Sequence, residues 1–365
     1  MMGIAALVLL FAVAWFIPWR LRRMLGFKPA LMWGLFALIL LGVAGFGLVV
    51  GTGRSATGGA PWGWIYNALG LFFMFILYVG CALFVAWPAA HWLKSFSQRK
   101  IAAAAVLISL FFVGVGFFNA QRFTVTEQAV ALPGLTCEVS VMHVSDLHLG
   151  TQRGERYLRN VVDAINERHP DLVLYNGDVA DSNAALRPEL FALFRDVKSE
   201  QFFTMGNHEY YIDTPRVLGL LEANGVNILR NRMVETHGIQ LIGLEYMNAD
   251  RTTFDAHRVN DLTVEEELPK IARDRMRPVL LAHHTPKGFH YAAQGGVDLM
   301  LSGHTHNGQV FPGMLFTTLL FPQNCGRYAE GAATLLVSQG AGTFGPWMRL
   351  GSFNELQFIR LIPEK

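Results

Sequence analysis

Acidic residues are missing from the first third of the chain. No Asp or Glu precedes Glu127, whereas residues 1–122 contain nine Lys or Arg residues. The rest of the chain contains 21 basic and 28 acidic residues, so the formal net charge of +2 is the sum of two unlike parts. The basic residues of the first part separate long apolar runs and do not cluster on one face. This pattern argues against a nucleic-acid partner.

Cysteine is scarce as well, with three residues in the whole chain. Cys81 lies inside an apolar run, and Cys137 and Cys325 are far apart in the sequence. Two cysteines can form a disulfide only where the fold brings their Cα atoms within about 7 Å. We therefore expect Cys137 and Cys325 to be free thiols.

Charged residues are also absent from four apolar runs. The runs are residues 3–19, 30–50, 64–90 and 101–119. A membrane-spanning helix needs about 20 predominantly apolar residues. The first run lacks the basic start of a secretory signal peptide and is instead followed by Arg20. We therefore expect an all-α domain of four transmembrane helices, residues 1–121, that anchors the chain in the plasma (inner) membrane.

The basic loops predict how these helices are oriented. Lys and Arg residues stay preferentially on the cytoplasmic side of a membrane. The loops after the first and third runs hold most of the basic residues, whereas the loop at 51–63 holds only Arg54. With four helices, the part of the chain after residue 121 lies outside the cytoplasm. The loss of one helix would reverse this orientation.

From residue 122 onward, short apolar runs alternate with helical patterns and end in polar loops. Five runs predict strands at residues 138–144, 172–175, 201–204, 279–282 and 299–301. Residues 156–169 predict a helix, because apolar residues recur there at helical spacing and Pro170 follows. Strands buried on both faces read as continuous apolar runs. Together with the helices they predict one layered α/β domain at residues 122–365.

Five polar motifs follow the predicted strands in a fixed order. They are Asp146-Leu147-His148, Gly177-Asp178, Gly206-Asn207-His208-Glu209, His283-His284 and Gly303-His304-Thr305-His306. Because ligand-binding loops gather at the carboxyl ends of strands, we expect the five motifs to converge. Their imidazoles, carboxylates and carboxamide are suitable ligands for two neighbouring divalent ions, with Mn, Fe or Zn favoured.

Spacing within the motifs indicates how such ions would be held. Asp146 and His148 are two residues apart, so in extended backbone both side chains point the same way and can hold one ion. Asp178 follows a glycine at a strand end, where a carboxylate can bridge two ions, and Asn207 offers a carbonyl oxygen. Two ions roughly 3.5–4 Å apart bind the attacking and leaving oxygens of a phosphoryl displacement. The motifs therefore predict metal-assisted hydrolysis of a phosphate ester.

With these motifs, residues 135–360 resemble the calcineurin-like metallophosphoesterase superfamily, including the Gly308-Gln309 pair after the last motif. Its membrane-anchored bacterial branch and the transmembrane proteins with a metallophosphoesterase domain are the most similar groups. The resemblance implies a four-layer α/β/β/α sandwich with a dinuclear metal centre. One ion would be held by Asp146, His148 and His306, and the other by Asn207, His304 and one histidine of the 283–284 pair. Asp178 would bridge the two ions, and His208 would either donate a proton to the leaving group or stabilise the phosphoryl oxygens.

The fourth motif departs from the family pattern, in which one residue separates the histidine from a proline. The segment Leu281–Pro286 offers both His283 and His284. Spacing from Pro286 favours His284, with His283 as the alternative.

The apolar segment at residues 310–322 follows directly after the last motif. It is either a strand or cap packed on the core, or an interfacial element that lets a lipid tail stay in the membrane while its phosphate enters the site. The predicted function is therefore a membrane-anchored phosphoesterase in which a hydroxide held between the metals attacks a phosphomonoester or phosphodiester. Phosphate-bearing lipids are the leading substrate class.

A non-catalytic membrane sensor or transport component with a metal-binding C-terminal domain is the alternative function. Missing ligands would favour it, and so would charged residues inside the apolar runs, which mark ion or substrate paths. The sequence shows neither feature.

Overall fold

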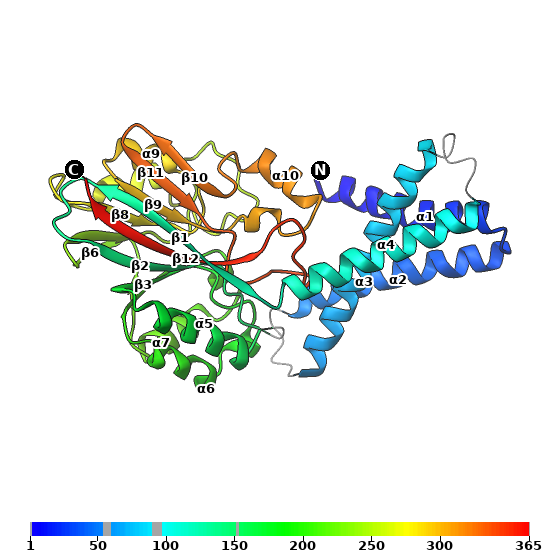
Figure 1. The fold of residues 1–365 in the computed structure, drawn as a ribbon, viewed down its shortest axis with the longest axis horizontal. Helices are drawn as coiled ribbons and strands as arrows, with labels where there is room; N and C mark the ends of the chain where they lie inside the picture. The colour runs from blue at the N-terminus through cyan, green and yellow to red at the C-terminus, as the bar shows by residue number, and fades with distance from the viewer. Residues whose placement is uncertain (1, 54–59, 90–96, 151–152, 365) are drawn as a thin grey trace. The chain divides into compact units, whose positions relative to one another are not determined.

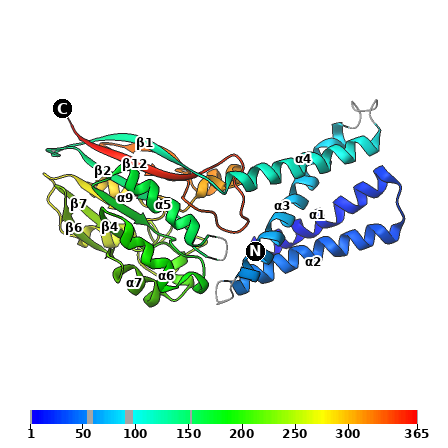
Figure 2. The same ribbon diagram turned by 60° about the horizontal axis from the view of Figure 1, so that its bottom comes forward.

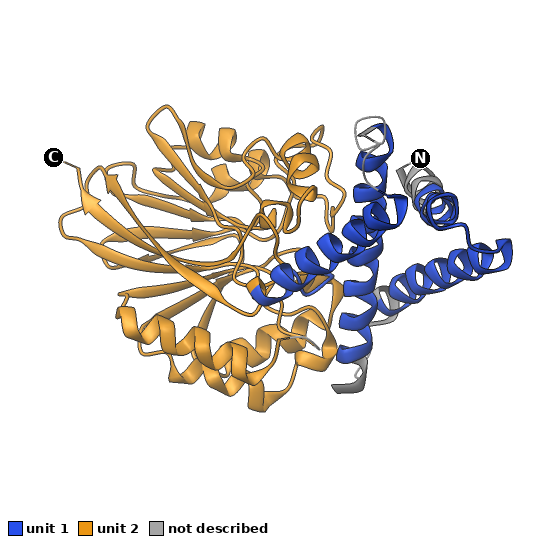
Figure 3. Ribbon diagram, turned by 45° about the vertical axis from the view of Figure 1, so that its right-hand side comes forward, with its two compact units in different colours: residues 1–53, 60–118, 345–348 blue, residues 54–59, 119–344, 349–365 orange. Residues whose placement is uncertain are grey.

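The computed structural model describes residues 2–53, 60–89, 97–150 and 153–364. They form two compact units, which Figure 3 shows in different colours. The first unit contains the N-terminal helices up to Phe118 together with residues 345–348. The second unit contains Asn119–Phe344 and Arg349–Lys365. Each unit has an apolar core of its own.

Four helices make up most of the first unit: α1 (Met2–Leu25), α2 (Pro29–Gly53), α3 (Ala60–Ala89) and α4 (Gln98–Asn119). Three stretches of described residues are long and apolar enough to cross a membrane, namely Pro29–Val49, Gly63–Pro88 and Gln98–Asn119. They confirm three of the four predicted apolar segments. The other segment, 3–19, lies in α1, and the side chains of residues 1–10 are outside the described part of the chain. The total of four spans therefore stays a prediction.

Helices of the first unit pack through apolar and small side chains. Ile17, Ile39 and Leu83 are buried in one cluster contributed by α1, α2 and α3. Gly80 allows α3 to approach α1 closely, since a Cβ atom there would lie 3.2 Å from carbons of Ile17 and Val13. Small residues at helix crossings are typical of membrane helices, which associate through close packing.

The second unit is built on two six-stranded sheets (Figure 1). The first sheet has the order β1 (Phe123–Leu132), β12 (Asn354–Pro363), β2 (Val139–Val144), β3 (Leu172–Asn176), β4 (Glu200–Thr204) and β5 (Val226–Leu229). The second has the order β10 (Gly326–Glu330), β11 (Ala333–Val337), β9 (Leu299–Ser302), β8 (Val279–Ala282), β7 (Ile239–Gly243) and β6 (Arg232–Thr236). In both sheets the central neighbours pair in parallel, β2 to β5 in one and β7, β8, β9 and β11 in the other.

Helices cover the outer faces of both sheets. The first sheet is covered by α5 (Glu155–Arg168), α6 (Pro188–Phe191) and α7 (Thr214–Glu222), which lie together in Figures 1 and 2. The second is covered by α8 (Val264–Glu267) and α9 (Phe289–Gln294). Another helix, α10 (Gly313–Leu320), precedes β10. Short 3-10 helices are η1 (Asn183–Ala185), η2 (Ala192–Asp196), η3 (His208–Tyr211), η4 (Leu268–Lys270) and η5 (His306–Gly308).

Three apolar layers result from this arrangement. On β2, Val141 belongs to the core between the sheets, whereas its neighbour Met142 belongs to the core beneath the helices. Both faces of the strand are buried, which explains why these two neighbouring residues are both apolar. A third core lies between the second sheet and its helices. The predicted α/β/β/α sandwich is thus confirmed.

The predicted elements match closely. All five predicted strands exist with ends within one residue of the predicted ends, and α5 occupies the predicted helix at 156–169 to within one residue. The sequence patterns did not indicate the pairing of β1 with β12, which joins residues more than 220 positions apart. The three cysteines are free, as expected for Cys137 and Cys325.

Candidate metal centre

All five motifs begin at the carboxyl ends of strands. β2, β3 and β4 of the first sheet lead into the first three motifs, and β8 and β9 of the second sheet lead into the other two. Because β2 to β4 are parallel neighbours and β8 and β9 are parallel neighbours, their loops emerge at a common edge. The two sheets thus supply opposite halves of one site.

The backbone of these loops is left-handed at most candidate ligands. Positive φ angles occur at Asp146 (58°), His148 (50°), Asp178 (53°), His304 (69°) and His306 (50°). Such conformations cost a non-glycine residue about 1–3 kcal/mol each and cluster at functional sites. The extended backbone that we expected between Asp146 and His148 is therefore wrong. Their side chains converge because the chain turns sharply at both residues.

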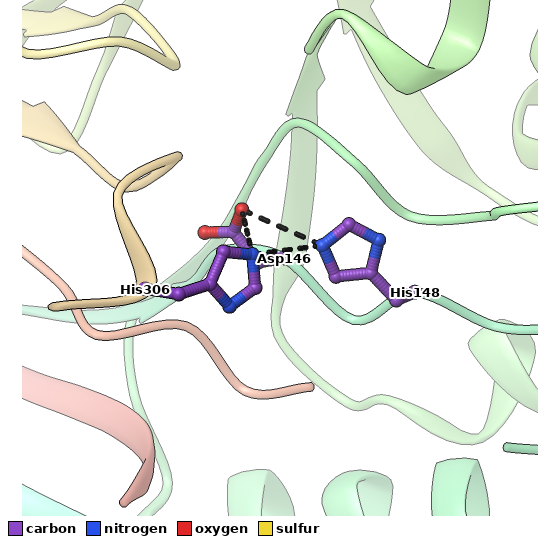
Figure 4. Close-up of side chains that lie close together, drawn as sticks. All are labelled: Asp146, His148 and His306. Atoms are coloured by element: carbon purple, nitrogen blue, oxygen red, sulfur yellow. Dashed lines mark hydrogen bonds and ion pairs between the residues drawn. The ribbon is translucent and has the colours of Figure 1, made fainter. Parts of the chain in front are cut away.

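Asp146, His148 and His306 form the first cluster of candidate ligands (Figure 4). His306 Nε2 lies 3.2 Å from Asp146 Oδ1 and 3.0 Å from His148 Nε2. All three side chains are buried, and Asp146 Oδ1 accepts no hydrogen bond within the described residues. Two imidazole nitrogens and an unpartnered carboxylate oxygen that point at one spot suit a divalent cation.

Asp178, His284 and His304 form the second cluster. His284 Nδ1 donates a hydrogen bond to the carbonyl oxygen of Asn176 at 2.7 Å, so in the neutral ring Nε2 carries the lone pair. That Nε2 lies 3.1 Å from Asp178 Oδ2 and 3.7 Å from Asp146 Oδ1. A backbone carbonyl that fixes the tautomer in this way is typical of metal-binding histidines.

Asp178 lies between the clusters. It also belongs to a third group of possible ligands, with His148 and His208. Its Oδ2 lies 3.8 Å from His208 Nε2 and 4.0 Å from His148 Nε2, besides its contact with His284. A carboxylate that faces both sides of the centre is suited to bridge two ions.

Asn207 contributes the predicted carbonyl oxygen. Its side chain is 1% exposed, and its Oδ1 has no hydrogen-bond partner among the described residues. A buried amide oxygen without a partner costs about 1–3 kcal/mol. An ion would satisfy it.

The two histidines of the fourth motif have different surroundings. His284 faces both Asp146 and Asp178, whereas His283 belongs to none of the three groups of possible ligands. Both ring nitrogens of His283 are buried without a hydrogen bond among the described residues. Burial, with His284 beside it, lowers the pKa of His283 to about 3, so the ring is neutral. The geometry favours His284 as the candidate ligand.

Asp181 is a part of the site that the sequence analysis missed. Its Oδ1 lies 2.5 Å from His148 Nδ1 and 2.7 Å from His208 Nδ1. One carboxylate therefore orients both rings and directs their Nε2 atoms toward Asp178. The signal available in the sequence was a second Asp three residues after Asp178 in the same loop.

Glu209 was also overlooked, although it belongs to the third motif. Its buried carboxylate accepts hydrogen bonds from the backbone N–H groups of Gly206 (2.8 Å), Asp178 (3.0 Å) and Val179 (2.8 Å). Burial and the nearby Asp178 raise the pKa of Glu209. Glu209 thus ties the second motif to the third.

Gly206 permits the close approach of these two loops. A Cβ atom at this position would lie 2.1 Å from Asp178 Oδ1 and 2.6 Å from the Asp178 backbone nitrogen. Both distances are shorter than non-bonded contacts allow, so any larger residue would displace Asp178. The glycine of the third motif is therefore required by packing.

The buried charges of the centre perturb one another. Burial raises the pKa of Asp146, but His306 and His284 together lower it well below its usual range. Burial lowers the pKa of His148, but Asp181 and Asp146 raise it to about 10. His284 behaves similarly, since Asp178 and Asp146 outweigh burial and raise its pKa to about 9. The centre thus stabilises positive charge at a site where cations would lie.

Several aromatic side chains lie beside His304. The His257 ring is 5.3 Å and the Phe321 ring 5.4 Å from that of His304. Tyr246 donates a hydrogen bond to Asp255 at 2.6 Å and lies 3.5 Å from His304 Nε2. His257 therefore lies closer to the centre than its position outside the motifs indicated, although it belongs to none of the three groups of possible ligands.

Arg349 connects the loop of His306 to residues 339–342 through hydrogen bonds. It is fully buried and donates to the carbonyl oxygens of Gln339 (2.6 Å), Gly342 (2.6 Å) and His306 (2.8 Å). Its guanidinium group also lies 3.1 Å from His306 Nδ1 and donates a hydrogen bond to Asn354 Oδ1 at 3.0 Å. No carboxylate forms an ion pair with it among the described residues, so its stabilising effect rests on these hydrogen bonds.

Replacing Arg349 with Ala is expected to lower the free energy of unfolding by about 3 kcal/mol or more, because several buried carbonyl groups lose their donor. For a domain of this size the loss corresponds to a decrease in Tm of about 6–12 °C, measurable by thermal unfolding of the full chain. Arg360→Ala is the control, since Arg360 is exposed and pairs only with the exposed Glu138. Similar decreases for both variants would show that the buried network adds nothing.

Comparisons with known proteins support the chemistry of this site. The model of the calcineurin-like phosphoesterase family matches residues 139–308, which include every candidate ligand. The chain is 29% identical over 279 residues to an uncharacterized metallophosphoesterase of Helicobacter pylori, covering 73% of each chain. It is 30% identical over 239 residues to another from Aquifex aeolicus, covering 64% of this chain and 88% of that relative.

A vertebrate relative is named as a transmembrane protein that has a metallophosphoesterase domain. The chain is 29% identical over 323 residues to the transmembrane protein with metallophosphoesterase domain of Bos taurus, covering 80% of this chain and 71% of the relative. These matches confirm the resemblance found in the motifs. The chain therefore belongs to the calcineurin-like metallophosphoesterase family and is a hydrolase of phosphoric ester bonds.

Proposed function

We propose that the protein is a membrane-anchored phosphoesterase with a dinuclear metal centre. One ion is assigned to Asp146, His148 and His306, and the other to Asn207, His284 and His304. Asp178 is assigned as the bridge between them. The observation that carries the proposal is that Asp178 belongs to two of the three groups of possible ligands and faces the remaining one.

The residues present fit two divalent ions. Asp146 Oδ1, Asn207 Oδ1 and His284 Nε2 are buried acceptors without hydrogen bonds in the described chain. Mixed imidazole and carboxylate oxygen donors suit Mn, Fe or Zn. Such ions would neutralise charge on the phosphoryl group and lower the pKa of a water molecule toward neutrality.

His208 is assigned as the proton donor to the leaving group. Its side chain is 12% exposed, so it can reach a substrate, and its Nδ1 contacts Asp181 at 2.7 Å. Because Asp181 holds Nδ1, the ring presents Nε2 toward the centre. Histidine is a common general acid, and a ring in this position can pass a proton to the departing oxygen.

Replacing His208 with Ala is expected to slow hydrolysis of esters with poor leaving groups by about 100-fold, because general acid catalysis typically contributes 10²–10⁴-fold. Esters of p-nitrophenol need little protonation and should lose much less. Steady-state rates for an alkyl and a p-nitrophenyl phosphate ester would measure the difference. Equal losses on both would exclude a proton-donating role.

The substrate and its location are part of the proposal. The membrane-capable helices keep the enzyme at a lipid bilayer, which favours a lipid-linked phosphate over a freely diffusing one. If α1 is a fourth span, the positive-inside rule predicts that the second unit lies outside the cytoplasm. Labelling of the exposed Cys137 by a membrane-impermeant thiol reagent in intact cells tests this orientation.

The experiment that tests the proposed function compares bis-p-nitrophenyl phosphate with p-nitrophenyl phosphate, with added Mn. Hydrolysis of the first supports a phosphodiesterase, and hydrolysis of the second alone supports a phosphomonoesterase. Absence of hydrolysis with either, in protein that binds two ions, would favour the non-catalytic sensor or transport component.

A further inference from the structure

Helix α10 presents an apolar surface to solvent directly after the metal centre. The segment 310–322 contains no charged residue, and α10 has no buried side chain. Five large side chains of the segment 310–322 are strongly exposed, and together they are called the α10 patch: Phe311 (50%), Leu315 (60%), Phe316 (65%), Leu319 (81%) and Leu320 (57%). The four helical members fall at spacings of one, three and one, which places them on one face.

This concentration is unusual for the second unit. Only four other large apolar side chains are exposed there among the described residues, and they lie apart in the sequence: Phe254, Met276, Phe344 and Phe353. Single exposed apolar residues are normal on soluble surfaces, whereas a contiguous patch marks a contact with another molecule or with a membrane.

Both ends of α10 are connected to the candidate ligand loop. The backbone N–H of Gly313 donates to the carbonyl oxygen of Val310, and the N–H of Val310 donates to the carbonyl oxygen of Gly308. These bonds join the end of η5 to the start of α10. After the helix, the Phe321 ring lies against the ring of His304. The α10 patch is therefore a rigid continuation of the loop that carries His304 and His306.

Residues that follow Phe321 are also hydrogen-bonded to the candidate ligand loop. Thr305 Oγ1 donates to the carbonyl oxygen of Asn324 at 2.5 Å, and Asn324 Nδ2 donates to Asn307 Oδ1 at 2.8 Å. Lys287 Nζ lies 4.8 Å above the Phe321 ring. Both ends of α10 are thus held beside the centre.

The chain itself indicates what covers the patch. Helix α4, which is long and apolar enough to cross a membrane, ends at Asn119, and β1 begins at Phe123. The three residues between them span at most about 14 Å, even when fully extended. With α4 in a membrane, the start of the second unit therefore stays close to the bilayer surface, and a phospholipid bilayer is the apolar phase nearest to it.

We propose that the α10 patch inserts into the acyl-chain boundary of the bilayer and that a phosphate carried by a membrane lipid enters the metal centre along α10. Insertion follows from the exposed apolar face and the short connection to α4. The second step rests on the proposed function. The absence of charge from 310–322 means that burial of apolar surface, rather than attraction to anionic headgroups, stabilises the contact.

Insertion can be measured without any activity. The three native cysteines, Cys81, Cys137 and Cys325, are replaced by Ser, and an environment-sensitive fluorophore is attached to Leu319→Cys in the full chain reconstituted into phosphatidylcholine vesicles. Lipids with nitroxide groups on their acyl chains are expected to quench this probe at least fivefold more than a probe at Met276→Cys. Met276 is the matched control because it is 83% exposed in the same unit but lies outside the patch.

Insertion of the α10 patch would be refuted if the acyl-chain nitroxides quenched the probes at positions 319 and 276 equally, and no more than a water-soluble quencher does. A second measurement addresses substrate entry through the ratio of rates on a lipid-embedded and a water-soluble phosphate ester. Leu319→Ser with Phe316→Ser is expected to lower this ratio at least tenfold, and Met276→Ser to leave it within twofold. An unchanged ratio in the double variant would overturn the lipid route, whereas failure of the wild-type chain to hydrolyse either ester would refute only the proposed function.

Discussion

Replacing Asp178 with Asn is expected to reduce the rate of phosphate-ester hydrolysis by about 10³-fold and to lower the metal content from two ions to one. Asp178 Oδ2 faces His284 at 3.1 Å and lies 3.8–4.0 Å from His208 and His148, so its charge reaches both halves of the centre. Loss of one preorganised electrostatic element typically slows an enzyme by 10²–10³-fold, and loss of an ion adds to this. Asparagine preserves the shape of the side chain, so the substitution removes charge with little change in packing.

The measurement combines turnover of p-nitrophenyl substrates in added Mn with metal content determined by mass spectrometry. Asp261→Asn is the control, because Asp261 is an exposed carboxylate far from the motifs in sequence, with a side chain that is 90% exposed. Rates within tenfold of wild type and two bound ions in Asp178→Asn would refute the bridging role.

The second large effect separates the paired histidines of the fourth motif. His284→Ala is expected to lose one of two ions and about 10³-fold in rate, since its Nε2 faces both Asp178 and Asp146. His283→Ala should keep both ions, because neither of its ring nitrogens contacts a candidate ligand among the described residues. The two residues are adjacent and equally buried, so each variant controls for the other.

Loss of stability must be distinguished from loss of metal in this comparison. Truncation of a buried side chain of this size leaves a cavity and costs about 2–5 kcal/mol, so both variants should unfold at lower temperature. Metal content below the unfolding temperature then decides between them. Retention of both ions in His284→Ala together with loss of one in His283→Ala would reverse the assignment.

Several parts of the fold could be predicted because their signals are local. The strands that lead into the motifs contain short apolar runs, and α5 is amphipathic and ends before Pro170. The strands β1 and β12 were not predicted as a pair, because the residues that pair lie more than 220 positions apart in the sequence. Pairing over such a distance leaves no pattern within either segment.

The candidate site was predictable by residue type but not by geometry. Extended backbone was expected to bring Asp146 and His148 together, whereas the structure uses left-handed turns at both residues. The residues next to Asp181 and Glu209 in the sequence do not indicate what these two carboxylates contact. Their roles depend on the rings and backbone N–H groups that other loops bring within 3 Å.

The sequence by itself determined the reaction class, the order of the ligand-bearing loops and the presence of membrane-capable helices. These features depend on residue type and on periods of two to twenty residues, which a linear pattern records. Only the tertiary structure decided that His284 rather than His283 faces the carboxylates, that Asp178 lies between two clusters and that the apolar side chains of α10 remain exposed. Each of these depends on the direction of a side chain relative to a distant strand, and that direction is set by sheet pairing and backbone turns.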